Sequence, residues 1–264
     1  MVEQQVQLNQ TQIDNFDREG YLFFPKLFDD AEVKSLKDAL PDLLERDGPE
    51  VVYEPESPDA VRLVYGGHDW SEPYRKLSLH PRLLNPVKQL LREDTYLHQS
   101  RLNPKQDFGG GVWSWHQDFG TWHKVDGMPE PHCVMTMIFL DDCTAVNAPL
   151  MIVPGSQSFG HIDSAKEDTN ARGYALFDID RKTLTRLSDN SPVEALLGPA
   201  GSVAFLHCNI VHGSSNNISP YSRTVMYFNY NAVSNACTNT ERAWHHNNRD
   251  FTPLQALEDN CLGK

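Results

Sequence analysis

The feature that most constrains the fold is a series of short apolar runs that begins near residue 95 and continues to about residue 230. Glycine, proline and asparagine separate the runs, and each has the length of a single strand. The clearest are Thr95–Asn103, Val112–Trp115, Val134–Leu140, Leu150–Val153, Val203–Leu206 and Val225–Tyr230. Many short strands with turn residues between them are typical of sandwiches and barrels. The pattern predicts an antiparallel core, which we expect to be a double-stranded β-helix of the jelly-roll type.

Apolar residues at helical spacing dominate the first 94 residues instead. Asn9 or Thr11 can cap a first helix, which ends at Gly20. A second helix begins at residue 29 or 30, and Pro41 kinks or breaks it. The expected elements of this part are helices over residues 9–20, 29–46 and 82–93 and a strand over residues 21–24. A shorter helix over residues 180–188 is expected among the later strands.

Residues 47–70 are polar, and Pro55 and Pro58 interrupt them. Around the apolar run Val61–Tyr65 we expect a hairpin or a mobile flap, hinged at Gly66-Gly67. The whole chain, residues 1–264, is predicted to be one domain, mainly β with helices. Its expected parts are a helical support with the flap (1–94), the jelly-roll core (95–235) and a C-terminal tail (236–264).

The charge balance is strongly acidic. A formal net charge of −13 and an isoelectric point near 5.2 argue against nucleic acid and anionic membrane surfaces as partners. No apolar run is long enough to span a membrane, and residues 1–5 lack the features of a signal peptide. The five cysteines form no Cys-x-x-Cys pair, which favours reduced thiols. We therefore expect a cytoplasmic monomer or homodimer.

The segment Trp113–His123 contains a candidate metal-binding pair, His116 and Asp118. On a strand, residues two apart point to the same face, so the imidazole and the carboxylate can converge. With a second histidine they form the set that binds non-haem Fe(II) and leaves positions open for a co-substrate and O2. The alternative is an edge-strand or loop pair that is solvated or bonded to backbone. Three nearby tryptophans favour a ligand pocket.

His212 is the best candidate for the second histidine. It follows an apolar run, and Gly213 allows backbone or ligand to approach closely at the rim of a barrel. His207 is nearer to that run, but a core or supporting role is expected for it. The adjacent pair His245-His246 lies in a polar tail, and we expect it to be solvated.

Arg223 opens an apolar strand eleven residues after His212. A buried guanidinium needs a partner, and its rigid fork of donors suits a carboxylate. We expect that carboxylate to be the distal one of 2-oxoglutarate, with Ser214 donating a second hydrogen bond. The alternative is that Arg223 pairs with an acidic side chain at the surface.

Taken together, these motifs resemble the phytanoyl-CoA dioxygenase-like superfamily of Fe(II)/2-oxoglutarate oxygenases, and within it the ectoine hydroxylases and the bacterial free-proline 4-hydroxylase. The matching segments are His98–Arg101, Trp115–Phe119, Thr121–His123, Asp126–Pro129, Ala148–Leu150, Val153–Ser156 and Gly201–Arg223. The resemblance spans most of the chain. It implies a cupin-like jelly roll with iron on His116, Asp118 and His212. It also implies that 2-oxoglutarate is held by Arg223 and Ser214, with help from Asn103.

The resemblance also points to a substrate wall. Gln99 and Trp122 match positions that line the substrate pocket of ectoine hydroxylases, while Met135, Leu206 and Tyr227 differ from what those enzymes carry. Further departures are Gln117 in place of Ser, Gly120 in place of Glu, and Cys133 and Met137 in place of small residues. Gln99 or Arg62 can meet a substrate carboxylate. The iron and co-substrate sites thus match the family, whereas the substrate wall is altered.

The resulting hypothesis is an Fe(II)- and 2-oxoglutarate-dependent hydroxylase that uses O2, with ascorbate as an aid in vitro. The carboxylate of Asp118 favours hydroxylation, or demethylation begun by hydroxylation, because related halogenases lack it. The expected substrate is a small amino acid or zwitterion, such as a proline-, ectoine- or mycosporine-like compound. The alternatives are an acyl-CoA or peptide substrate, a cupin-like binding module without activity, and a zinc hydrolase.

Overall fold

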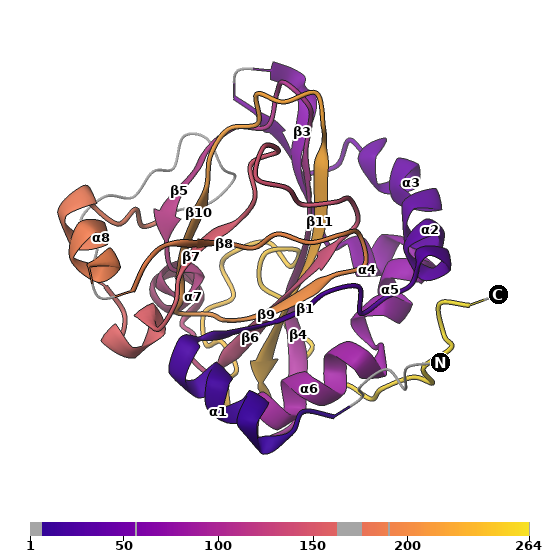
Figure 1. Cartoon of the computed structure of the whole chain (residues 1–264). Helices are drawn as coiled ribbons and strands as arrows, with labels where there is room; N and C mark the ends of the chain where they lie inside the picture. The colour runs from indigo at the N-terminus through magenta and orange to yellow at the C-terminus, as the bar shows by residue number, and fades with distance from the viewer. Residues whose placement is uncertain (1–6, 56, 163–175, 190, 264) are drawn as a thin grey trace.

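Two antiparallel sheets form the centre of the protein in the computed structural model, which describes residues 7–55, 57–162, 176–189 and 191–263 (Figure 1). The larger sheet has the strand order β1 (Tyr21–Phe24), β9 (Val203–His207), β6 (Cys133–Phe139), β11 (Arg223–Ala232), β4 (Thr95–Lys105), β3 (Ser57–Tyr65) and β2 (Val51–Glu54). The smaller sheet has the order β5 (Trp113–His116), β10 (Val211–Ser214), β7 (Met151–Val153) and β8 (Glu194–Ala195). This pair of sheets is the predicted jelly-roll core.

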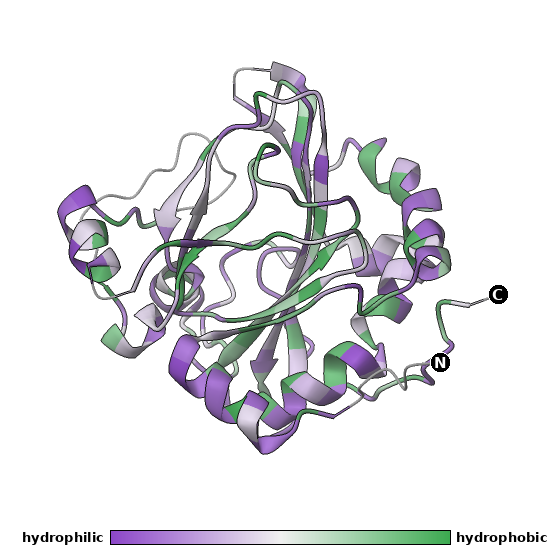
Figure 2. Ribbon diagram, in the orientation of Figure 1, coloured by the Kyte–Doolittle hydropathy of each residue, from purple (hydrophilic) through white to green (hydrophobic). Residues whose placement is uncertain are grey.

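In the described part of the chain, six helices precede β4 and lie outside the larger sheet (Figure 1). They are α1 (Gln10–Glu19), α2 (Asp30–Asp38), α3 (Leu40–Leu44), α4 (Gly67–Trp70), α5 (Glu72–Ser78) and α6 (Pro81–Leu91). Their buried residues form one apolar cluster with the outward face of β6, β9 and β11, including Leu36, Leu84 and Phe205. Figure 2 shows hydrophobic colours on parts of the central strands, mixed with hydrophilic ones, and hydrophilic turns on the outer helices. The expected N-terminal helical layer is therefore present.

Local signals explain where the first helices begin and end. Asn9 caps α1 with a reciprocal bond to Gln12, and Gly20 ends it in the left-handed conformation. Asp29 caps α2 in the same way. The helical region then breaks just before Pro41, which occupies the first turn of α3. These boundaries match the predictions from sequence.

The predicted hairpin of the 47–70 region consists of β2 and β3, and β3 continues the larger sheet beside β4. Its closure over the site stays a prediction. Two short helices, α4 and α5, follow it and were not predicted. The remaining helices are α7 (Asp118–Asp126), α8 (Arg181–Ser188) and two 3-10 turns at Ser156–Phe159 and Val233–Asn235. Among the described residues, no helix is long and apolar enough to cross a membrane.

A second apolar cluster fills the space between the two sheets. It contains residues of β6, β9 and β11 together with Leu150 and Ile152 at β7. It also holds four of the cysteines, among them Cys208, the expected small core residue. All five cysteines are free thiols. The space between the sheets is thus packed at one end, which leaves the other end for a ligand.

Gly201 is a point where the fold tolerates no side chain. It leads into β9 at φ +86°, and a Cβ there would lie 2.1 Å from the carbonyl oxygen of Phe28. We expect Gly201→Ala to lower the free energy of unfolding by about 2 kcal/mol or more, because backbone strain and a steric clash add. Gly155→Ala is the matched control: its φ is +74°, but the nearest atom is 3.6 Å away. The free energy of unfolding of both variants would be measured by urea denaturation. An equal decrease in the two variants would contradict the steric argument.

Candidate active site

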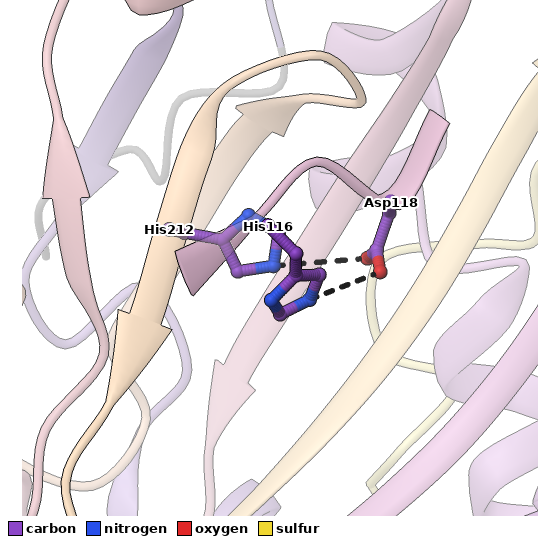
Figure 3. Close-up of side chains that lie close together, drawn as sticks. All are labelled: His116, Asp118 and His212. Carbon is purple, nitrogen blue, oxygen red and sulfur yellow. Dashed lines mark ion pairs between the residues drawn. The ribbon is translucent and has the colours of Figure 1, made fainter. Parts of the chain in front are cut away.

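The three predicted metal donors lie together where the two sheets meet (Figure 3). His116 ends β5, His212 lies opposite it on β10, and their ring centroids are 4.2 Å apart. The Nε2 atoms of His116 and His212 lie 3.4 Å and 3.9 Å from the two carboxylate oxygens of Asp118. All three donor atoms lie within 4.8 Å of one another, and all three residues are buried. One metal ion can therefore contact all three.

Asp118 reaches this point differently from the prediction. The expectation that His116 and Asp118 share one face of a strand is wrong, because Asp118 is the first residue of α7 and Gln117 is its N-cap. The chain turns sharply at Gln117, and the turn brings the carboxylate back toward the imidazole of His116. The spacing thus indicated donors that do converge, but for the wrong local reason, and their binding of a metal stays a prediction.

The surrounding groups prepare the three donors for a metal. Nδ1 of His116 lies 2.6 Å from the carbonyl oxygen of Ser114, and Nδ1 of His212 lies 3.0 Å from that of Ile210. A carbonyl oxygen only accepts, so each Nδ1 carries the hydrogen and each Nε2 presents its lone pair. Burial and the nearby His116 lower the pKa of His212 to about 3, which keeps it neutral.

Arg101 of β4 pairs with Asp118 through both oxygens. Burial alone would raise the pKa of Asp118, but the charge of Arg101 holds that pKa well below its usual range. Asp118 is therefore an anion at neutral pH. Two imidazoles and one carboxylate on one side of a common point fit Fe(II) and leave room for further ligands.

A cavity begins at the histidines and extends between the sheets to Arg223. Its lining residues are Leu63, Arg101, Asn103, Trp113, His116, Leu150, His212, Ser214, Arg223 and Tyr227. The three residues expected to hold 2-oxoglutarate, Arg223, Ser214 and Asn103, are thus on one cavity with two of the metal donors. These three residues come from β11, β10 and β4.

Arg223 is prepared to receive an anion. Its side chain is 1% exposed, and one terminal nitrogen donates to Oδ1 of Asn103 at 3.0 Å. Among the described residues, its Nε and other terminal nitrogen have no hydrogen-bond partner. Buried charged donors without partners are costly. A carboxylate in the cavity would satisfy them, so the residues present fit 2-oxoglutarate. The alternative pairing of Arg223 with a surface acid does not occur among the described residues.

Arg101 and Lys105 were given no role from the sequence. Both lie on β4, and Lys105 donates from Nζ to Oγ of Ser214 at 2.9 Å. The signal was present, because Gln99, Arg101, Asn103 and Lys105 alternate along one strand. Residues two apart on a strand share a face. A row of polar residues on one face of a buried strand indicates a site.

The predicted substrate residues are dispersed around the donors. Tyr227 lines the cavity. Met135 and Leu206 lie opposite each other on β6 and β9 and are fully buried. Trp122 is buried on α7 against His98, with ring centroids 5.1 Å apart. Their contact with a substrate stays a prediction.

Two other predicted substrate residues have partners within the protein. Gln99 donates to the carbonyl oxygen of His246 at 2.8 Å. Arg62 forms an ion pair with Glu54 at 2.5 Å and lies over the ring of Trp113 at 3.9 Å. Arg62 thus fastens the hairpin to the segment before the metal site, and its role toward a substrate stays a prediction.

The expectation that His245-His246 is solvated is wrong. His245 is 5% exposed, and the ring of His246 packs against Tyr65 with centroids 4.4 Å apart. The tail is held against the barrel by Arg242, whose guanidinium binds both oxygens of the buried Asp126 at 2.6 Å. The tail therefore closes the end of the barrel behind Gln99.

Two departures from the ectoine hydroxylase pattern affect the loop beside α7. The amide of Gln117 donates to the carbonyl oxygens of Gly160 and Asn209 and accepts from the backbone N–H of Ile162. A Cβ on Gly120 would lie 3.0 Å from the ring of His161. The long side chain of Gln117 and the absence of a side chain at Gly120 thus allow residues 160–162 to lie close to α7, the helix that carries Asp118.

A jelly roll with two histidines and one aspartate at one end, and a buried arginine across the adjoining cavity, defines the non-haem Fe(II)/2-oxoglutarate-dependent dioxygenases. The sequence profile of one such family, phytanoyl-CoA dioxygenase (PhyH), matches residues 16–225. The chain belongs to this family. The sequence-based prediction of an enzyme that uses Fe(II), 2-oxoglutarate and O2 is thereby confirmed.

Individual relatives agree with this assignment. An L-proline trans-4-hydroxylase from Streptomyces griseoviridis is 35% identical over 256 residues, which cover 94% of this chain and 95% of that protein. An ectoine dioxygenase from Halomonas elongata is 34% identical, over 87% of this chain and 72% of the relative. The crystal structure of EctD from S. alaskensis with 2-oxoglutarate and 5-hydroxyectoine superimposes with a TM-score of 0.83 at 32% identity, covering 95% of this chain and 87% of that one.

Proposed function

We propose that this dioxygenase hydroxylates a small amino acid or an amino-acid-derived zwitterion, such as a proline-, ectoine- or mycosporine-like compound. The convergence of His116, Asp118 and His212 beside the cavity that ends at Arg223 carries the proposal. Two further facts support the substrate class. One relative of nearly equal length acts on L-proline, and the S. alaskensis structure contains 5-hydroxyectoine.

In this proposal His116, Asp118 and His212 hold the iron. Arg223, Ser214 and Asn103 hold the distal carboxylate of 2-oxoglutarate. When bound, the iron supplies the redox chemistry that activates O2, with decarboxylation of 2-oxoglutarate, toward a C–H bond of the substrate. The protein contributes fixed geometry: Arg101 fixes the carboxylate of Asp118, and the backbone carbonyls fix both imidazoles. Burial of the donors excludes bulk water.

The substrate is expected to approach from the side of Tyr227 and Arg101, because both line the cavity near the donors. Gln99, Trp122, Met135 and Leu206 would form the wall behind it. The indole N–H of Trp122 is buried and has no hydrogen-bond partner among the described residues. It is a candidate donor to a polar group of the substrate.

A substrate panel tests the proposal. We expect succinate formation to rise at least tenfold over the background rate with one or more free amino acids or cyclic imino acids, with a product 16 mass units heavier. Assays would contain Fe(II), 2-oxoglutarate and ascorbate, and mass spectrometry would detect the product. Coupled turnover only with acyl-CoA or peptide substrates would favour that alternative. Absence of any succinate formation would favour a binding module, and zinc-supported hydrolysis would overturn the oxygenase assignment.

We further propose that the chain acts as a single cytoplasmic domain, either as a monomer or as a homodimer. The five free thiols support a reducing compartment. Continuity of the larger sheet supports one domain, because β1 at one edge and β2 at the other both come from the N-terminal part of the chain.

A further inference from the structure

The end of the cavity near Arg223 contains more positive than negative charge. Lys105 lies directly opposite Arg223 in the register of β4 and β11, and both side chains are at most 2% exposed. Arg62 contributes a third cation from β3, and its ion-pair partner is Glu54 of β2. Glu54 also accepts a hydrogen bond from the backbone N–H of Gly111. Among the described residues that act on Lys105, Glu54 is thus the one carboxylate, and it already forms an ion pair with Arg62.

Lys105 is hydrogen-bonded but has no counterion. Its Nζ donates to Oγ of Ser214 and to the carbonyl oxygen of Ser215, and neither acceptor is charged. Within the described part of the chain, neither Lys105 nor Arg223 forms an ion pair with a carboxylate. Two buried like charges without a counterion are strongly unfavourable. Either one of these two side chains must lose its charge, or an anion must bind beside them.

Lysine is the member of this pair that can lose its proton, because a guanidinium stays charged at any pH a protein survives. Burial first, and then the charges of Arg223 and Arg62, lower the pKa of Lys105 to about 6, while Glu54 opposes the shift. Two more titratable groups face Arg223. Burial raises the pKa of Tyr227 and raises that of Cys143 to about 12, so both stay protonated near pH 7.

We propose that binding of the distal carboxylate of 2-oxoglutarate beside Arg223 is coupled to uptake of one proton by Lys105. This inference rests on the proposed role of Arg223 as the carboxylate's partner. In the empty pocket Nζ is a neutral amine. When the carboxylate enters, a proton from solvent adds to the lone pair of Nζ, and the resulting ammonium donates to Ser214 and Ser215. The hydroxyl hydrogen of Ser214 is then directed to the incoming carboxylate.

The sign of the resulting pH dependence follows from linkage. Because the bound anion raises the proton affinity of Lys105, the complex binds more protons than the free protein between the two pKa values. In that range the affinity for 2-oxoglutarate falls as pH rises, by up to roughly tenfold for each pH unit. A keto acid without a distal carboxylate would leave Lys105 neutral, so its affinity would lack this dependence.

Isothermal titration calorimetry tests the coupling without turnover. 2-Oxoglutarate would be titrated into the full chain loaded with Mn(II), at pH 7.5, in buffers of different ionisation enthalpy. The dependence of the observed heat on the buffer gives the number of protons taken up. We expect this number to approach one for the wild type and to fall near zero for Lys105→Met. The surface variant Lys88→Met is the matched control and should retain the wild-type value.

A second ligand keeps the test informative even if Lys105→Met does not fold. 2-Oxobutanoate shares the keto acid end of 2-oxoglutarate but lacks the distal carboxylate, so it should bind the wild type with almost no proton uptake. Equal uptake with both ligands would overturn the inference, because the proton would then go to the metal end. Binding of 2-oxoglutarate without uptake would also overturn it while the proposed function stands. If Arg223→Leu bound 2-oxoglutarate as tightly as the wild type, both this inference and the proposed role of Arg223 would be overturned.

Discussion

Replacing Asp118 with alanine is expected to abolish substrate-dependent succinate formation and to weaken Fe(II) binding. Asp118 supplies the only anionic donor of the described metal set, and its two oxygens also pair with Arg101. The loss of activity should exceed the roughly 10–100-fold that is typical when an outer partner of a metal ligand is removed. Metal binding measured by calorimetry with Mn(II) and turnover measured as succinate would be compared in the same preparation.

Two further variants distinguish an effect on metal binding from an effect on folding. Asp118→Ala leaves the buried Arg101 without its carboxylate, which costs about 3–5 kcal/mol of stability for a typical buried pair. Asp118→Asn keeps the shape and leaves the guanidinium a hydrogen-bond acceptor, so it should fold better while still losing the anionic donor. Asp38→Ala removes an exposed carboxylate that pairs with Lys34 and should change neither readout. Wild-type turnover in folded Asp118→Asn would show that Asp118 does not hold the iron.

The convergence of the candidate metal donors was predictable from sequence because their chemistry is rare, whereas the backbone between them was not. His116, Asp118 and His212 stood out by residue type, and Arg223 stood out as a charge at the start of an apolar strand. The turn at Gln117 has no such signal. Its amide is satisfied by backbone groups near residues 160 and 209, which no local pattern reveals.

The C-terminal tail shows a second limit of sequence patterns. Residues 244–250 are polar, and polarity alone predicts solvent exposure. Burial here comes from hydrogen bonds to backbone carbonyls of β4: the carbonyl oxygen of His98 accepts from the backbone N–H of Asn248, and that of Leu97 accepts from its side-chain amide. Backbone groups are present in every residue, so such docking depends on the three-dimensional arrangement. By contrast, the capped helices α1 and α2 were predictable because their signals lie within a few residues of each other.

The largest effect on co-substrate use is expected from Arg223→Leu. The substitution should raise KM for 2-oxoglutarate at least about 30-fold, because truncating one partner of a buried charge pair typically costs about 2–5 kcal/mol. Affinity for the metal should stay within about twofold, since the proposed metal donors are His116, Asp118 and His212. The contrast between an altered KM and an unaltered metal affinity distinguishes a carboxylate partner from a merely structural arginine. Steady-state kinetics at saturating substrate would measure it.

The shape of the ligand provides the stronger control for this prediction. If Arg223 binds the distal carboxylate, the wild type should prefer 2-oxoglutarate over 2-oxobutanoate strongly, and Arg223→Leu should lose most of that preference. Arg223→Lys should recover part of it, because an ammonium keeps the charge but not the planar fork of donors. Arg75→Leu, which removes a surface arginine paired with Glu72, should behave as the wild type. A preference that survives in Arg223→Leu would assign the carboxylate to another group, with Lys105 as the nearest alternative on the same strand pair.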